Sequence, residues 1–257
     1  MYRLCRGERL PLALFTALIL SLCAPAMADY RIMALGGSIT QGIGGEKSYR
    51  YSLIKMLDAS ACEFQMVGSQ SDNLTPTDFS SPHEGYSGHR IDYFLEGIEE
   101  SSGRVENAGI EQIMTSNPDV ILIHLGSVDM FVGQPVDGEY LVGGKGGTIA
   151  ELDELVARIW NSNPDAQLYM ADVIPWFGVS ASNPKIGEDI QSLSSAITGW
   201  IGEKADSRLH LVEVNKDYSA ELMQADLIHP NTAGDEFIAS RFMSVLRDNG
   251  VCPAQDQ

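Results

Sequence analysis

Short apolar runs alternate with amphipathic segments along most of the chain, and this alternation constrains the fold more than any other feature. Residues 119–126 (DVILIHLG) and 167–173 (QLYMADV) are almost continuously apolar, as strands are when helices cover both faces of a parallel sheet. Between them, residues 149–160 carry apolar side chains at helical spacing. Strands that alternate with helices in this way predict an α/β protein, a three-layer α/β/α sandwich with a central parallel sheet.

The same pattern divides the rest of the chain. Further strands are expected at residues 31–36, 64–68 and 209–214, and further helices at residues 48–57, 91–98, 105–115, 186–204 and 233–249. Residues 69–89 contain two prolines and several serines and aspartates, so we expect a polar loop there.

The first 28 residues have the pattern of a secretory signal peptide. Arg3, Arg6 and Arg9 precede an apolar run over residues 10–23, and residues 26–28 (AMA) form an A-x-A cleavage site. We therefore expect residues 1–28 to be removed on export, leaving one domain over residues 29–257 that is secreted or periplasmic. An uncleaved anchor is the alternative, but the apolar run is short for crossing a bilayer.

The charge of the chain limits its partners. Lys and Arg together number 17 against 35 Asp and Glu, which gives a net charge of −18 at pH 7. This excess of negative charge argues against nucleic acid and against anionic membrane surfaces as partners. It is compatible with a neutral substrate such as a sugar or an ester, and it also favours solubility.

Four cysteines are present, two of them within the expected signal peptide. Cys62 and Cys252 would remain after cleavage, and two cysteines in an exported protein suggest one disulfide. The sequence does not show whether the two lie close together. It contains neither a His-Glu-x-x-His motif nor a closely spaced cysteine pair, so we expect no metal site.

Three residues in two short motifs point to serine chemistry. Ser38 follows the first predicted strand, and Asp226 stands three residues before His229. A serine hydroxyl is a poor nucleophile until a base takes its proton, which histidine does best near neutral pH. A carboxylate on the other ring nitrogen holds the imidazole in the required tautomer. The sequence therefore predicts Ser38 as nucleophile, His229 as base and Asp226 as the group that orients it.

Four blocks of the chain resemble the SGNH (GDSL-type) hydrolase superfamily. They are residues 36–42 (GGSITQG), 83–90 (HEGYSGHR), 126–129 (GSVD) and 226–231 (DLIHPN). The resemblance implies a flavodoxin-like SGNH hydrolase fold and a Ser-His-Asp triad that needs no cofactor. The second block, together with residues 67–69 (VGS), resembles the acetyl-xylan-esterase-like branch of carbohydrate esterases. That branch implies the removal of acetyl groups from carbohydrate.

The resemblance also implies an oxyanion hole, in which the chain departs from the superfamily pattern. The expected donors are the backbone N–H groups of Ser38 and Gly88 and the side-chain amide of an Asn in the third block. Val128 stands in place of that Asn, and Gly37 replaces the usual Asp of the first block. Losing one such donor typically costs roughly 100- to 1000-fold in turnover. We expect a slow esterase, with a non-catalytic carbohydrate- or partner-binding protein as the alternative.

Two further side chains are candidates for binding substrate. Asp129 ends the third block, where it could brace the site or cap a neighbouring segment. Trp176 follows a strand at the active edge, where it could stack on a sugar ring, hold an acyl chain or pack beneath a loop. A lipolytic esterase or thioesterase with a preference for long acyl chains is a second enzyme alternative. The glycine-rich residues 131–147 could form a lid or a surface loop.

Overall fold

The computed structural model describes residues 29–252, apart from residues 45, 61, 76, 100–104, 133–146 and 182. The predicted signal peptide and most of the glycine-rich segment over residues 131–147 lie outside the described residues. Within the part of the chain that is described, no helix combines the length and the apolar character needed to cross a bilayer.

Strands and helices follow one another along the chain. The strands are β1 (Tyr30–Gly36), β2 (Phe64–Val67), β3 (Gln70–Asp72), β4 (Ser80–Gly85), β5 (Ile98–Glu99), β6 (Val105–Asn107), β7 (Val120–His124), β8 (Gln167–Ala171) and β9 (Leu209–Val212). The helices are α1 (Ser38–Gln41), α2 (Ser48–Ala59), α3 (Ile91–Glu96), α4 (Ile110–Ile113), α5 (Ser127–Val132), α6 (Thr148–Ser162), α7 (Ile186–Lys204) and α8 (Thr232–Asp248), with short 3-10 helices η1 (Met114–Ser116) and η2 (Ala220–Leu222).

Seven strands form the central sheet, in the order β3-β4-β1-β7-β8-β9, with β2 also paired to β1. Every pair is parallel except β3–β4. β1 lies in the middle, and at its carboxyl end Gly36 pairs with Gly85 of β4 and with His124 of β7. Three strand ends therefore meet two residues before Ser38, and ligand sites of parallel α/β sheets lie at this kind of edge.

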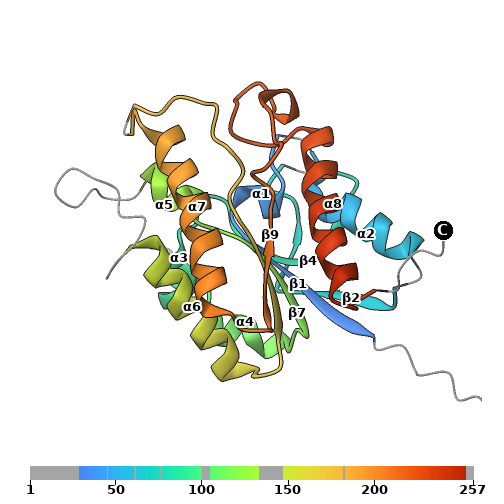
Figure 1. Ribbon diagram of the computed structural model, residues 1–257. Coiled ribbons are helices and arrows are strands. Elements are labelled where there is room, and N and C mark those ends of the chain that lie inside the picture. Colours follow the sequence, from blue (N-terminus) through green and yellow to red (C-terminus); the bar gives the residue numbers. More distant parts are fainter. Residues whose placement is uncertain are drawn as a thin grey trace, which may run out of the picture.

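Helices cover both faces of the sheet and make the three layers (Figure 1). α2 and α8 pack on one face, and α3, α4, α6 and α7 pack on the other. Side chains along β1 alternate between the two cores: Ile32 and Ala34 belong to the first, Met33 and Leu35 to the second. The predicted α/β/α sandwich is therefore confirmed, with one antiparallel strand added to an otherwise parallel sheet.

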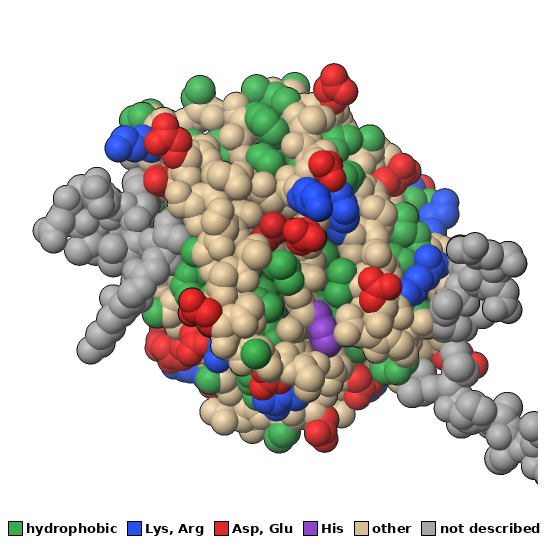
Figure 2. All heavy atoms as spheres, in the orientation of Figure 1, with side chains coloured by type: hydrophobic (Ala, Val, Ile, Leu, Met, Phe, Trp, Pro, Cys, Tyr) green, Lys and Arg blue, Asp and Glu red, His purple; other side chains and the backbone are tan. Residues whose placement is uncertain are grey.

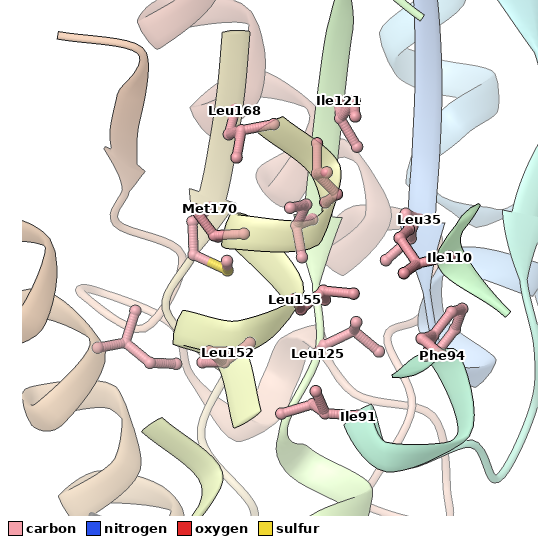
Figure 3. Packing of buried hydrophobic residues seen from close by; sticks show 14 of the residues in the cluster. Leu35, Ile91, Phe94, Ile110, Ile121, Leu125, Leu152, Leu155, Leu168 and Met170 are labelled. Carbon is pink, nitrogen blue, oxygen red and sulfur yellow. The ribbon is translucent and has the colours of Figure 1, made fainter. Parts of the chain in front are cut away.

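Leucine, isoleucine and methionine fill the core on the α6 side of the sheet (Figure 3). Leu152 and Leu155 of α6 face side chains that project from β1, β7 and β8. All of these side chains are fully buried, and each buried large aliphatic side chain contributes about 1.5–3 kcal/mol through the hydrophobic effect. This core fixes the strand ends on which the candidate site stands. The facing strand residues in Figure 3 are Leu35, Ile121, Leu168 and Met170.

Two segments differ from the sequence-based prediction. Residues 69–89, predicted as a polar loop, contain β3 and β4. Residues 105–115, predicted as one helix, contain β6, the short α4 and the start of η1. Gly109 interrupts this stretch with a φ of +80°. In β4, pairing with β1 outweighs a local composition typical of loops, because long-range strand pairing depends on context more than on propensity.

A disulfide joins the segment after α2 to the end of the described chain. Cys62 follows α2 and Cys252 follows α8, and their Cα atoms lie 5.0 Å apart across 190 residues of sequence. Beside it, α2 and α8 pack against each other through Tyr49 and Phe242, whose rings stack with centroids 5.3 Å apart. The bond whose formation the sequence left open is therefore present and closes the α2–α8 layer.

Charged side chains are dispersed over the surface in view. On the face shown in Figure 2, acidic side chains lie scattered among neutral ones instead of gathering into one patch. The acidic side chains on this face therefore do not form one charged patch. A dispersed arrangement of this kind suits a role in solubility.

Candidate active site

The first block forms a tight turn that places Ser38 at the start of α1. A Cβ atom added at Gly36 would lie 2.3 Å from Oγ1 of Thr40 and 2.6 Å from the carbonyl oxygen of His124. Only glycine fits this position, so the chain can turn directly from β1 into α1. α1 has only four residues, and a single helical turn is not stable by itself. The helix that carries Ser38 therefore depends on bonds from the rest of the fold.

Arg50 supplies much of that support. Its side chain is fully buried, and its guanidinium donates hydrogen bonds to carbonyl oxygens at the end of α1. Burial lowers the pKa of Arg50 to about 10, so the group keeps its charge at pH 7. A positive charge there suits the carbonyl end of a helix. The acceptors are Thr40 O at 2.7 Å, Gln41 O at 3.1 Å, Ser81 O at 3.0 Å and Asn73 Oδ1 at 2.7 Å.

The loop before α8 that carries His229 is held by its own hydrogen bonds. The backbone N–H of Gln224 donates to the carbonyl of His229 at 2.8 Å, and its side-chain amide donates to the carbonyl of Pro230 at 2.9 Å. Asn231 then caps α8, since its side chain accepts the N–H of Gly234 at 3.1 Å. The motif residues that follow His229 thus fix where the loop ends and the helix begins.

Ser38, His229 and Asp226 form a continuous chain of hydrogen bonds. Oγ of Ser38 lies 2.9 Å from Nε2 of His229, and Nδ1 of His229 lies 2.7 Å from Oδ2 of Asp226. Because a carboxylate only accepts, Nδ1 carries the ring proton and Nε2 accepts the hydroxyl proton of Ser38. Residues 191 positions apart meet in the geometry that activates a serine.

Asp226 is held as a carboxylate. Burial alone would raise its pKa, but the hydrogen bonds from the His229 ring and from the backbone N–H groups of His229 and Ile228 outweigh burial and lower it. The backbone N–H of Ile228 donates to Oδ1 at 2.9 Å and that of His229 donates to the same oxygen at 3.0 Å. An acceptor fixed at both oxygens can orient the imidazole without rotating itself.

A cavity of about 210 Å³ opens beside Ser38 and His229. Most of its wall is apolar, and the rings of Phe131 and Trp176 stack against each other with centroids 5.2 Å apart. The structure thus places Trp176 in the wall of the cavity. The lining residues are Ser38, Ile39, Ser87, Gly88, Ser127, Val128, Phe131, Ile174, Pro175, Trp176, Ile228 and His229.

Gly88 and Val128 stand at the expected oxyanion hole. Gly88 lines the cavity with a φ of +77°, and no atom lies within 4 Å of a Cβ added there, so the space on that side of the residue is open. Val128 lines the same cavity, and its Cγ2 lies 3.8 Å from a Cβ built on Gly37. The two departures from the family pattern are therefore neighbours, and methyl groups occupy the place expected for an amide donor.

Asp129, a predicted substrate-binding residue, is buried between α5 and the start of α3. It is only 7% exposed, and its Oδ1 accepts the backbone N–H of Ile91 at 3.2 Å. Burial raises the pKa of its carboxyl to about 8, and the charge of Glu151 adds to that shift. Asp129 therefore braces the start of α3 against α5, and it is not among the residues that line the cavity.

Some contributors to the site lie outside the four blocks. Phe131 and Ile174 reach the cavity from two separate segments. Arg50 also lies outside the blocks but carries a local signal, because it lies three residues before Leu53 on the buried side of α2. A charged residue on an otherwise apolar helical stripe indicates a buried polar contact.

Among the described residues, no group of three or more His, Cys, Asp or Glu side chains is placed to hold a metal ion.

The hydrogen-bonded Ser-His-Asp chain, at the carboxyl edge of a mostly parallel sheet, is the arrangement found in serine hydrolases. Residues 34–237 match the GDSL-like Lipase/Acylhydrolase family. The chain therefore belongs to this family, and hydrolysis of acyl esters is the activity that its membership supports.

Solved structures of similar fold include two carbohydrate esterases. The family 3 carbohydrate esterase of Clostridium thermocellum superposes with a TM-score of 0.67 at 24% identity, over 86% of this chain and 96% of that chain. The family 3 carbohydrate esterase from Talaromyces cellulolyticus gives 0.65 at 20% identity, over 85% and 99%. A multidomain esterase of Ruminococcus flavefaciens is 24% identical over 241 residues, which are 90% of this chain and 30% of that relative.

Proposed function

We propose that this protein is an exported serine esterase that hydrolyses short-chain acyl esters, above all acetyl esters of carbohydrate. The observation that carries the proposal is the hydrogen-bonded chain from Ser38 through His229 to Asp226, with links of 2.9 Å and 2.7 Å. Its position beside a cavity gives the serine hydroxyl access to an ester.

The reaction would proceed in two steps that share one oxyanion hole. Oγ of Ser38 attacks the ester carbonyl while His229 takes the hydroxyl proton, and the backbone N–H groups of Ser38 and Gly88 stabilise the oxyanion. His229 then gives the proton to the departing alcohol, which leaves an acyl-serine. Water, deprotonated by His229, attacks this ester, and Ser38 leaves with the proton returned. Asp226 stabilises the imidazolium in both steps.

The preference for acetylated carbohydrate rests on similarity. Two structures of similar fold are named as family 3 carbohydrate esterases, and the second block of this chain resembles an acetyl-xylan-esterase-like pattern. The strongly negative net charge of −18 suits a neutral substrate better than an anionic one. The signal-peptide pattern of residues 1–28 and the Cys62–Cys252 disulfide support export.

The cavity wall favours a second candidate function, a lipolytic esterase or thioesterase that accepts longer acyl chains. Ile174, Phe131 and Trp176 give it an apolar surface, and Leu227, next to the lining residue Ile228, is 39% exposed at a φ of +59°. A bulky residue held in the left-handed region is uncommon, and here it sits within the loop that carries His229. Leu227 thus adds an exposed apolar side chain beside the lining residue Ile228.

Hydrolysis of p-nitrophenyl esters with acetyl, butyryl and octanoyl groups distinguishes these functions. We expect hydrolysis fastest with acetate, lost in Ser38→Ala and unchanged in Ser195→Ala, an exposed serine on α7. Rates that rise from acetate to octanoate would favour the lipolytic candidate. A folded protein with no hydrolysis of any ester, which still binds carbohydrate after Ser38→Ala, would identify a non-catalytic binding protein.

A further inference from the structure

Gln41, the last residue of α1, connects the nucleophile helix to the turn that carries Gly88. Its side-chain Oε1 accepts the backbone N–H of Ser87 at 2.8 Å, across 46 residues of sequence. Ser87 directly precedes Gly88. This bond therefore ties the residue before Gly88 to the helix that carries Ser38. The first and second blocks of the family pattern are thus joined by one side chain.

The turn around Gly88 needs such an anchor. The N–H of His89 donates to the carbonyl of Tyr86 at 3.2 Å and closes the turn, and Gly88 stands third with a φ of +77°. The positive φ of Gly88 at the third position is that of a type II turn, which sets the direction of the Gly88 N–H within the turn itself. The closing bond does not set where the whole turn lies relative to α1 and the Ser38 N–H.

The backbone of Gln41 offers a fixed base for this anchor. A Cβ added at Gly85 would lie 2.6 Å from the backbone nitrogen of Gln41, so α1 packs directly on the end of β4. The guanidinium of Arg50 on α2 donates a hydrogen bond to the carbonyl of Gln41 at 3.1 Å. Because the main chain of Gln41 is held in this way, its side chain keeps a fixed distance between α1 and the turn that contains Ser87.

We infer that Gln41 is a positioning residue that aligns the two backbone oxyanion donors, the N–H groups of Ser38 and Gly88. The inference rests on the proposed function. Because Gly37 and Val128 leave the hole without the side-chain groups that the family pattern supplies, the alignment of the two remaining donors determines how well an oxyanion is stabilised. Gln41 would therefore act on the transition state and leave ground-state binding of the ester almost unchanged.

The test compares two isosteric variants of Gln41. Gln41→Met removes the acceptor, and we expect kcat for p-nitrophenyl acetate to fall about 10- to 100-fold with KM within about threefold, a smaller loss than removing a donor outright. Gln41→Glu keeps an acceptor of the same length, and its kcat should exceed that of Gln41→Met by about tenfold. Gln191→Met, an exposed glutamine on α7, is the control and should match the wild type.

Each contrary outcome has a distinct meaning. If Ser38-dependent hydrolysis is unaffected in Gln41→Met, the positioning role is wrong and the esterase proposal stands. If Gln41→Glu is as slow as Gln41→Met and both melt well below the wild type, Gln41 serves stability alone and the inference is again overturned. If the wild type shows no serine-dependent hydrolysis, the proposed function fails and the inference fails with it.

Discussion

At the scale of single residues, Val128 is the side chain on which the strength of the site depends. It lines the cavity beside Ser38 and faces Gly37, where the family pattern has an amide and a carboxylate. Valine offers no hydrogen-bond donor, while the backbone donors of Ser38 and Gly88 do not depend on side-chain type. We therefore expect an oxyanion hole that works but is weakened.

Restoring an amide at this position should therefore accelerate the reaction. We predict that Val128→Asn raises kcat for p-nitrophenyl acetate by about 10- to 100-fold, since one oxyanion donor is worth roughly 100- to 1000-fold when well aligned. Val128→Leu is the matched control, because it has a similar size and no donor, and it should not exceed the wild type. Equal rates in Val128→Asn and Val128→Leu would show that an amide here does not reach the oxyanion.

The sequence predicts the residues of the hydrogen-bonded chain more readily than those that support them. Ser38, Asp226 and His229 lie in short motifs beside predicted elements, so local pattern was sufficient to find them. Gln41 and Arg50 act on backbone groups 46 and 31 residues away. Local periodicity and composition contain no information about such partners, which become visible only when β4 lies against α1.

At the scale of elements, the contact between α5 and α3 carries a buried titratable group. Asp129 on α5 accepts the N–H of Ile91 at the start of α3, and burial raises the pKa of its carboxyl to about 8. A folded-state pKa above the unfolded value means that the folded protein binds the proton more tightly. Stability is therefore lost as pH rises from the unfolded pKa near 4 towards 8.

Replacing this carboxyl by an amide should remove that loss. We predict that Asp129→Asn, which keeps an oxygen to accept the Ile91 N–H, gains free energy of unfolding relative to the wild type, and more at pH 8 than at pH 5. Urea unfolding of both proteins at the two pH values measures the difference. A difference that is the same at pH 5 and pH 8 would show that Asp129 does not titrate with a raised pKa in the folded state.

Strands were harder to predict than helices wherever their pairing partners are distant. β1, β7 and β8 are apolar on both faces, so continuous apolar runs identified them. β4 has a proline, a serine pair and one acidic residue, a composition typical of loops. Its pairing with β1 through Glu84 and Gly85 is not encoded locally. Residues 105–115 have apolar spacing that fits a helix, yet Gly109 and the β5–β6 pairing divide them.

At the scale of the whole molecule, one covalent bond closes almost the entire described chain into a loop. Cys62 and Cys252 are separated by 190 residues, and both are buried next to α2 and α8. α8 begins directly after the loop that carries His229. A bond that restricts the unfolded chain therefore also secures the layer on which the base of the site depends.

Removing this disulfide should destabilise the fold without altering the chemistry. We predict that the double variant Cys62→Ser, Cys252→Ser loses about 2–5 kcal/mol of unfolding free energy, as is typical for a native disulfide. Its kcat at 25 °C should equal that of the wild type, because neither cysteine lines the cavity among the described residues. Denaturant unfolding under oxidising conditions measures the loss. An unchanged midpoint would contradict the prediction.

The central claim is that His229 and Asp226 activate Ser38 as a nucleophile, and covalent trapping tests it most directly. The purified protein is incubated with a fluorophosphonate, which reacts with activated serines, and the adduct is located by peptide mass spectrometry. The account predicts one adduct, on Ser38, that forms far more slowly in His229→Ala and is absent in Ser38→Ala. A folded protein that acquires no adduct, or acquires it on a different serine, would contradict the account.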